Sequence, residues 1–240
     1  MIFLAVMTGF FAESYREHLG EQSKEHEYAV NIKKDLLRDT VNVNVWIPAL
    51  HNRVAKFDTL IWYLETDGIV KEGANMYLLA RLSTRNSIYE PSDNTISEMK
   101  SSGNLRLIHN REIVNSLMNH ERTLEQYKNV VDMEEKEDIL SYPLLAQLFD
   151  AAVTDKMTNV SKNRILSEKE YAGQSLDVLH MPPGNPQLIN HDKEKVNELI
   201  YYLHQRKSSF LGEMRHLMGM KNQDIELLKQ LNEEYKLDDE

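Results

Sequence analysis

Glu213 and His216 are the residues whose types and spacing come nearest to a metal-binding motif. Three positions apart on a helix, a carboxylate and an imidazole lie on one face, as they do in di-iron helical bundles. Those sites require a second Glu-x-x-His and two more glutamates on facing helices, and the nine histidines of the chain supply no second copy. We therefore expect this pair to lie on solvated surface or at the edge of an apolar seam, and we expect no metal site.

The turn formed by Ser102, Gly103 and Asn104 is a second candidate, because it offers a hydroxyl and a glycine-loosened backbone. It lacks both the strand–turn–helix context of a nucleophile elbow and the Lys-Ser/Thr ending of a phosphate-binding loop. We expect a structural turn that ends a helix, with Gly103 at positive φ. The Ser/Thr-x-x-Glu spacing of Thr95 and Glu98 predicts a capping box where that helix begins.

His120 lies between Leu117 and Leu124 on the apolar face of a helix predicted over residues 110–140. We expect its ring to be at least partly buried at a core edge with one hydrogen bond, and it is also a candidate pH-sensitive contact. The charge run at 132–138 lacks the glycine and the alternating ligand spacing of a calcium loop, which indicates a solvated helix face. No set of nucleophile, base and orienting residue is recognisable, so we expect neither catalytic activity nor a cofactor.

Composition favours a helical protein with protein partners. The 240 residues include only 9 Gly and 6 Pro and are 28% charged, which fits one or two helical domains with a real core. Because 38 acidic residues stand against 28 basic ones, the net charge is −10, and broad binding to nucleic acid is not expected. The absence of cysteine excludes disulfides, thiolate metal ligands and a cysteine nucleophile.

The first twelve residues carry no charge, and Glu13 then opens a long charged segment. A membrane span needs about 20 apolar residues, so this run is short for one. A signal peptide is disfavoured because no basic region precedes the run and no small-x-small cleavage site follows it. We expect the end of a truncated transmembrane helix whose leading residues are missing. The alternatives are an end packed in a soluble core and an interfacial or cleaved segment.

Two predicted helices, over residues 28–64 and 196–235, carry apolar residues at alternating spacings of three and four, as coiled-coil seams do. Polar residues interrupt the second seam at Lys207, Lys221 and Asp224. We expect the seams to pack against one another or against a second copy of the chain. The residues proposed as the interaction seam are Phe57, Ile61, Leu64, Phe210, Met214 and Leu217.

The predicted fold is all-α, an elongated helical bundle with long coiled-coil-like helices and the truncated N-terminal transmembrane helix. Residues 1–27 form the membrane-anchor segment and a juxtamembrane helix, and residues 28–153 the first part of a helical domain. Residues 154–187 are an irregular connector that ends in a Pro-rich run. Residues 188–240 form a long C-terminal helix that packs on the bundle.

Four stretches carry a family resemblance: FFAESYREH at 10–18, EHEY at 25–28, DLLRD at 35–39 and ISEMKSSGNLRLI at 96–108. They resemble a domain-of-unknown-function family of single-pass membrane proteins common in Bacteroidota. The resemblance implies an N-terminal membrane helix and a helical domain outside the inner membrane. Members usually have a fuller hydrophobic helix, so this chain departs from the family at its start. No activity or site residue is established for the family.

We therefore expect a membrane-anchored helical protein that acts through protein–protein interaction or self-assembly. Its partners would be the lipid bilayer, through the N-terminal segment, and other proteins or a second copy. The expected location is the inner membrane, single-pass, with the body in the periplasm; only Arg16 and Lys24 are basic in 13–27, and cytoplasmic flanks are richer in such residues. The alternative is an extracytoplasmic sensor-like module that binds a small ligand between helices, with the connector as part of the pocket.

Overall fold

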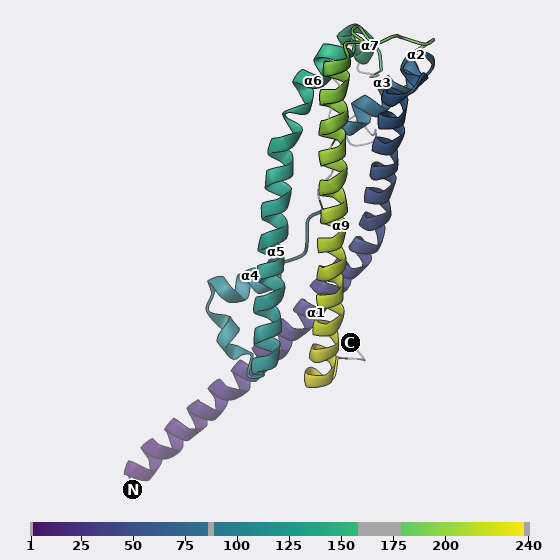
Figure 1. Cartoon of the computed structure of the whole chain (residues 1–240). Helices are drawn as coiled ribbons and strands as arrows, with labels where there is room; N and C mark the ends of the chain where they lie inside the picture. The colour runs from purple at the N-terminus through teal and green to yellow at the C-terminus, as the bar shows by residue number, and fades with distance from the viewer. Residues whose placement is uncertain (1, 86–88, 158–178, 238–240) are drawn as a thin grey trace. The chain divides into compact units, whose positions relative to one another are not determined.

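The computed structural model of the chain describes residues 2–85, 89–157 and 179–237. Within these ranges the regular elements are helices and no strand is present, which confirms the prediction of an all-α fold and fits a helical bundle. In chain order the elements (Figure 1) are α1 (Ile2–Glu65), α2 (Gly68–Lys71), α3 (Gly73–Ser83), α4 (Asn94–Ser101), the short 3-10 helix η1 (Asn104–Leu107), α5 (Arg111–Asp138), α6 (Ser141–Leu148), α7 (Ala151–Asp155) and α9 (Lys193–Tyr235).

The chain divides into two compact units that do not follow chain order. Unit 1 comprises Met1–Ile47, Tyr89–Asn129 and Met214–Glu240, and unit 2 comprises Pro48–Ile88 and Val130–Glu213. The boundaries fall inside α1, α5 and α9, so each of these long helices contributes to both units. Each unit has its own buried apolar residues.

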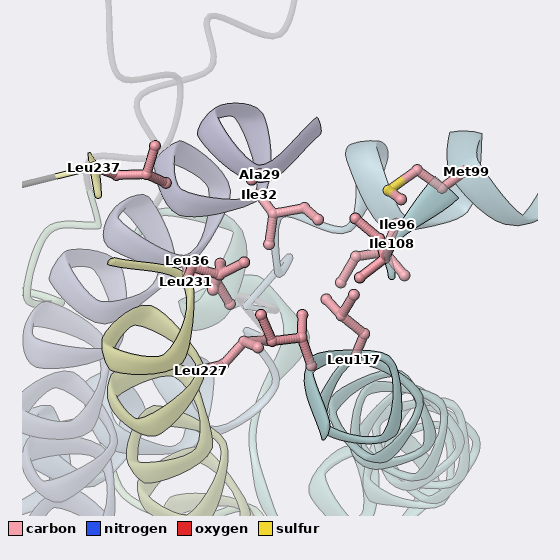
Figure 2. Packing of buried hydrophobic residues seen from close by; sticks show 11 residues of the cluster. Ala29, Ile32, Leu36, Ile96, Met99, Ile108, Leu117, Leu227, Leu231 and Leu237 are labelled. Atoms are coloured by element: carbon pink, nitrogen blue, oxygen red, sulfur yellow. The ribbon is translucent and has the colours of Figure 1, made fainter. Parts of the chain in front are cut away.

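An apolar cluster between α1, α4, α5 and α9 forms the core of unit 1 (Figure 2). Leu36 of α1 and Leu231 of α9 meet in it, and Leu117 of α5 points into the same region. Burial of each aliphatic side chain contributes about 1.5–3 kcal/mol, so this cluster is a main source of stability for the unit. Its members are Ala29, Ile32, Leu36, Ile96, Met99, Ile108, Ile113, Leu117, Leu227, Leu231 and Leu237.

Two carboxylates of α1 hold the chain where α4 begins. Both oxygens of Asp39 accept hydrogen bonds from the backbone N–H of Ser92, at 2.9 and 3.0 Å. One turn earlier, Asp35 accepts hydrogen bonds from the backbone N–H of Thr95, at 3.3 Å, and from its hydroxyl, at 2.6 Å. Free N–H groups at a helix start need such acceptors, and here α1 supplies them from outside the helix.

The predicted capping box of Thr95 and Glu98 is wrong. α4 begins at Asn94, so its N-cap residue is Asp93, two positions before Thr95, and Asp93 makes no side-chain capping bond. Thr95 cannot act as the N-cap because it already lies inside α4, where its hydroxyl donates to Asp35. Glu98 accepts a hydrogen bond from the Tyr28 hydroxyl at 3.1 Å instead of turning back to the helix start.

α4 ends in the turn of Ser102, Gly103 and Asn104. Gly103 has φ +73°, a left-handed conformation that favours glycine. The Ser102 hydroxyl donates to the Glu98 carbonyl at 2.8 Å, and the Asn104 amide donates to the Tyr28 hydroxyl at 2.8 Å. These bonds tie the turn to α4 and to α1.

No helix in the described ranges is long and apolar enough to cross a membrane, so the predicted transmembrane helix lacks support. The N-terminal apolar residues instead belong to α1, whose 64 residues form one continuous helix. Phe3 is 75% exposed and Phe10 is 73% exposed, so this end of α1 is not packed in a core.

The predicted connector lies largely outside the described residues, since 158–178 are not among them. Its last part packs on the start of α3, where the Asn185 side chain accepts from the Gly73 backbone N–H at 2.7 Å and donates to the Val70 carbonyl at 2.8 Å. A Cβ on Gly73 would lie 2.0 Å from the Pro186 carbonyl oxygen, so only glycine permits this approach.

Candidate functional site

The residues proposed as an interaction seam are buried inside the chain. In unit 2 the rings of Phe57 and Phe210 stack with centroids 5.4 Å apart, and each residue is 2% exposed. In this conformation the seam residues are therefore core and not outer surface. The other four are also buried: Ile61 and Leu64 in unit 2, and Met214 and Leu217 in unit 1.

A buried charged network lies beside Phe210 in unit 2. Arg206 of α9 is 1% exposed, and its Nε lies 2.7 Å from Oδ1 of Asp138 on α5. Glu134, one turn earlier on α5, places Oε2 3.6 Å from a terminal nitrogen of Arg206. The Tyr202 hydroxyl donates to Asp138 at 3.1 Å. A buried guanidinium requires such carboxylates, because an unpaired charge in the interior is strongly unfavourable.

Phe210 also contacts two guanidinium groups. The Cζ of Arg206 lies 4.7 Å from the centre of its ring, and the Cζ of Arg53 on α1 lies 5.0 Å from it. Cations over an aromatic face attract it by about 0.5–2 kcal/mol each. Phe210 therefore joins the apolar contact with Phe57 to the charged network.

Glu134 and Asp138 belong to the charge run at 132–138, whose predicted solvated face is wrong for these two residues, since they are 8% and 9% exposed. Their environment favours protonation. Burial raises the pKa of Glu134 from its ordinary value of 4.5 to about 7, against the attraction of Arg206. Burial also raises the pKa of Asp138, which Arg206 and the Tyr202 hydroxyl oppose. Glu213 adds a further negative charge that raises the pKa of Glu134.

The expectation for Glu213 and His216 holds for one of the two. His216 is exposed as expected. Glu213 is only 4% exposed, and its charge acts on Glu134 and on Arg53. In the part of the chain that the structure describes, no group of three or more His, Cys, Asp or Glu side chains is arranged to hold a metal ion.

Unit 1 contains a buried histidine–aspartate pair. His120 of α5 is 1% exposed, and its Nδ1 lies 3.0 Å from Oδ1 of Asp224 on α9, which is fully buried. Sequence reasoning placed both residues on apolar seams, and the structure brings them together. The pair lies in a core and lines none of the cavities described below.

A carboxylate at the other end of unit 1 has a lowered pKa. Burial alone would raise the pKa of Glu25, but hydrogen bonds from the His109 backbone N–H, the Tyr235 hydroxyl and the His109 ring lower it below 4.5. Glu25 also raises the pKa of His109 through the hydrogen bond and charge attraction. This contact connects α1 to the segment before α5 and to the end of α9.

The candidate binding site is a cavity of about 440 Å³ in unit 2, walled by α3, α6 and α7. Cavities of this size are typical of small-molecule sites, which combine apolar walls with a few polar groups. Small residues leave the space open, since Ala80, Ala146 and Ala151 all line it. Thr154 and Asp155 at its rim belong to the predicted connector.

Three aromatic residues, Tyr77, Tyr142 and Phe149, line this cavity, here called the aromatic pocket. Tyr77 and Phe149 meet edge to face with centroids 4.9 Å apart. The Tyr77 hydroxyl accepts from the Asp150 backbone N–H at 2.7 Å and donates to the Gln187 carbonyl at 3.2 Å, which fixes the ring. Arg81 donates to the Thr84 hydroxyl at 3.0 Å and supplies a positive charge at the wall.

Sequence analysis did not identify the residues of the aromatic pocket. The sequence did contain one signal: Tyr142, Ala146, Phe149 and Ala151 lie close together in the chain, and large rings alternate with small side chains among them. The groups in the pocket can stack and form hydrogen bonds, and Arg81 and Asp155 supply one positive and one negative charge, which suits binding.

A scan against protein-family models, a search of curated proteins and a search of solved structures each find no match. The family resemblance drawn from the four stretches above therefore stays a prediction.

Proposed function

We propose that the chain is a membrane-tethered helical protein that acts by binding other proteins or a second copy of itself, without catalysis. The observation that carries the proposal is the run of exposed apolar side chains at the start of α1. Phe3, Leu4, Val6, Phe10 and Phe11 are 63–75% exposed, far more apolar surface than one helix end normally leaves to water. Insertion of these residues into a lipid interface would remove that surface from water.

A second apolar stripe on α1 supports assembly with a protein. Leu37, Val41 and Val45 are four residues apart and 46%, 62% and 69% exposed, so they form one outward face of the helix. In the same unit, the Lys221 ammonium of α9 donates to the side chain of Asn44 at 2.7 Å, next to this stripe. A partner helix would bury the stripe in the manner of a coiled coil.

We propose that the body lies on the exported side of the inner membrane. The support is the scarcity of basic residues after the apolar run, where Arg16 and Lys24 are the only ones before residue 28. Cytoplasmic flanks of membrane segments are richer in Lys and Arg.

A crossed experiment with two variants tests tethering and assembly separately. Phe10→Asp should abolish flotation of the chain with phosphatidylcholine vesicles and leave its sedimentation mass unchanged. Val41→Asp should lower the sedimentation mass and leave flotation unchanged. Each Phe buried in lipid contributes about 1.5–3 kcal/mol, so the first variant should weaken partitioning by at least about tenfold.

Equal flotation of the wild type and Phe10→Asp would overturn the tether. A monomeric wild type that also retains no protein from its native membrane would overturn the binding role. Helix content measured by circular dichroism should be the same in both variants, since both residues are exposed.

The aromatic pocket supports a second candidate function, binding of a small ligand by a sensor-like module. The pocket combines the rings of Tyr77 and Phe149 with the opposite charges of Arg81 and Asp155, and the ligand we favour is a flat aromatic group whose carboxylate reaches Arg81. A lining that combines aromatic and polar side chains supports this alternative.

Naphthalene and 1-naphthoate form a matched pair of probes for this candidate. In calorimetric titrations 1-naphthoate should bind more tightly than naphthalene, because only the carboxylate interacts with Arg81. Ala146→Phe should fill the pocket and weaken 1-naphthoate at least about tenfold, whereas Ala146→Ser should bind as the wild type does. Equal affinity of Ala146→Phe and the wild type would place any binding elsewhere.

A further inference from the structure

Another cavity, of about 310 Å³, lies in unit 2 between α1 and α3 and is lined by basic residues. Arg53 and Lys56 of α1 and Arg85, just after α3, contribute three positive charges. No Asp or Glu is among the described residues that line it. This concentration of positive charge is unusual in a chain with a net charge of −10.

The basic side chains are positioned by the fold. Arg53 donates to the Arg85 carbonyl at 2.6 Å, which connects α1 to the end of α3. The Arg53 guanidinium also lies over the Phe210 ring at 5.0 Å, so its direction is set from two sides. Phe57, Leu79 and Leu82 contribute apolar surface to the lining.

The charges in the cavity are only partly compensated. Burial lowers the pKa of Arg53, and three carboxylates outside the cavity lining, those of Glu213, Asp138 and Glu134, oppose this shift. Lys56 is half-buried and has no hydrogen-bond or ion-pair partner within the described ranges. An ammonium group that is partly removed from water without a partner is stabilised when an anion approaches it.

The shape and chemistry of the cavity suit a compact oxyanion. Arginine binds phosphate and carboxylate groups through two parallel N–H donors, and lysine adds a point charge. The side-chain amide of Asn52, at the rim, offers a further donor. The volume is too small for an extended polymer to enter as a whole and is sufficient for a phosphate ester or a dicarboxylate.

We propose that the cavity formed by Arg53, Lys56 and Arg85 is a binding site for a compact dianion, such as a phosphate monoester or a short dicarboxylate. The site shares no lining residue with the aromatic pocket and does not depend on the tether. Its two basic residues on α1 are three positions apart, so one helix face presents both charges.

Calorimetric titration of the full chain with inorganic phosphate at pH 8 tests the site. The wild type should show saturable binding that weakens as salt is added, since charge attraction provides it. Lys56→Gln should lower the affinity for phosphate at least about tenfold. Lys136→Gln changes an exposed lysine of the same unit outside the cavity and should bind as the wild type does.

Succinate and acetate, titrated in the same way, separate a dianion site from general anion attraction. Succinate should compete with phosphate, and acetate should compete far more weakly. Short-chain phosphatidic acid should also compete with phosphate for the site. If it binds more tightly than inorganic phosphate, the dianion is a lipid headgroup; if it binds more weakly, the dianion is a soluble phosphate.

The proposal is overturned if phosphate and succinate give no saturable heat, or if Lys56→Gln and the wild type bind phosphate equally. Lys56 is at the rim of the core, and thermal unfolding of Lys56→Gln near the wild-type temperature shows that the variant is folded. Arg53→Gln is the less suitable variant, because Arg53 also contacts Phe210.

Discussion

Replacing Arg206 by methionine is expected to destabilise the chain by about 3–5 kcal/mol. The residue is 1% exposed and lies 2.7 Å from Asp138 and 3.6 Å from Glu134, so its removal leaves two buried carboxylates without their cation. Methionine keeps much of the side-chain volume, which limits the effect of a cavity. Urea unfolding followed by circular dichroism measures the loss.

The loss should grow with pH. A carboxyl whose pKa is raised on folding holds its proton more tightly in the folded state. The free energy of unfolding therefore falls as the pH rises from the ordinary pKa of the group through its raised pKa. For Glu134 that window runs from 4.5 to about 7 in the wild type, and removal of Arg206 extends it upward. The difference between Arg206→Met and the wild type should therefore be larger at pH 8 than at pH 5.

Arg215→Met is the matched control, because Arg215 is an exposed arginine on the same helix. It should change stability by less than about 0.5 kcal/mol. Adding Glu134→Gln to Arg206→Met should recover part of the loss by removing one uncompensated charge. Equal stability of Arg206→Met and Arg215→Met at both pH values would show that the network does not stabilise the fold.

Truncating Phe210 to alanine is the second change with a large expected effect, again about 3–5 kcal/mol. The ring is 2% exposed and contacts Phe57 at 5.4 Å and the guanidinium groups of Arg53 and Arg206. Phe57→Ala should give a loss in the same range. Thermal and urea unfolding of both variants measure these losses.

A double-mutant cycle isolates the contact between the two rings. The double variant should lose less than the sum of the single losses, by about 0.5–1.5 kcal/mol, because the stack is lost only once. Phe210→Leu keeps apolar volume and should lose less than Phe210→Ala. Strict additivity would mean that the two rings are independent and that the stack contributes nothing.

The helices could be predicted from the sequence because their apolar residues repeat at helical spacing. Phe57 and Phe210 lie on two such seams, and both are buried where the spacing indicates a core. A local pattern of this kind depends only on which side chains avoid water. The starts of α5 and α9 are likewise local, since Asn110 and Asp192 accept bonds from N–H groups two and three residues later.

Features that depend on partners far apart in the chain could not be predicted in this way. The seam pattern includes Lys207 and leaves out its neighbour Arg206. A pattern of this kind assigns charged side chains off the seam to the surface, so it does not predict that Arg206 is buried. Only the positions of Glu134 and Asp138 on another helix make its burial possible. Lys207 lies toward the outside, where it pairs with Asp58 at 2.7 Å.

The start of α4 was missed for the same physical reason. The sequence predicts a self-contained cap by Thr95 and Glu98, but the helix begins before Thr95, and Thr95 bonds to Asp35, sixty residues away in the chain. The aromatic pocket combines residues of three helices and the basic cavity residues of two, so neither lining as a whole has a signature at fixed spacing.

α3 lines both cavities. Tyr77 and Arg81 belong to the wall of the aromatic pocket, and Leu79 and Ser83 to the wall of the basic one, so a single helix of 11 residues separates two chambers. A displacement of α3 toward one chamber enlarges the other. If a ligand in either cavity displaces this helix, the ligand in the aromatic pocket changes the affinity of the basic cavity for its dianion. The dianion then changes the affinity of the aromatic pocket by the same factor, since equilibrium coupling between two sites is reciprocal.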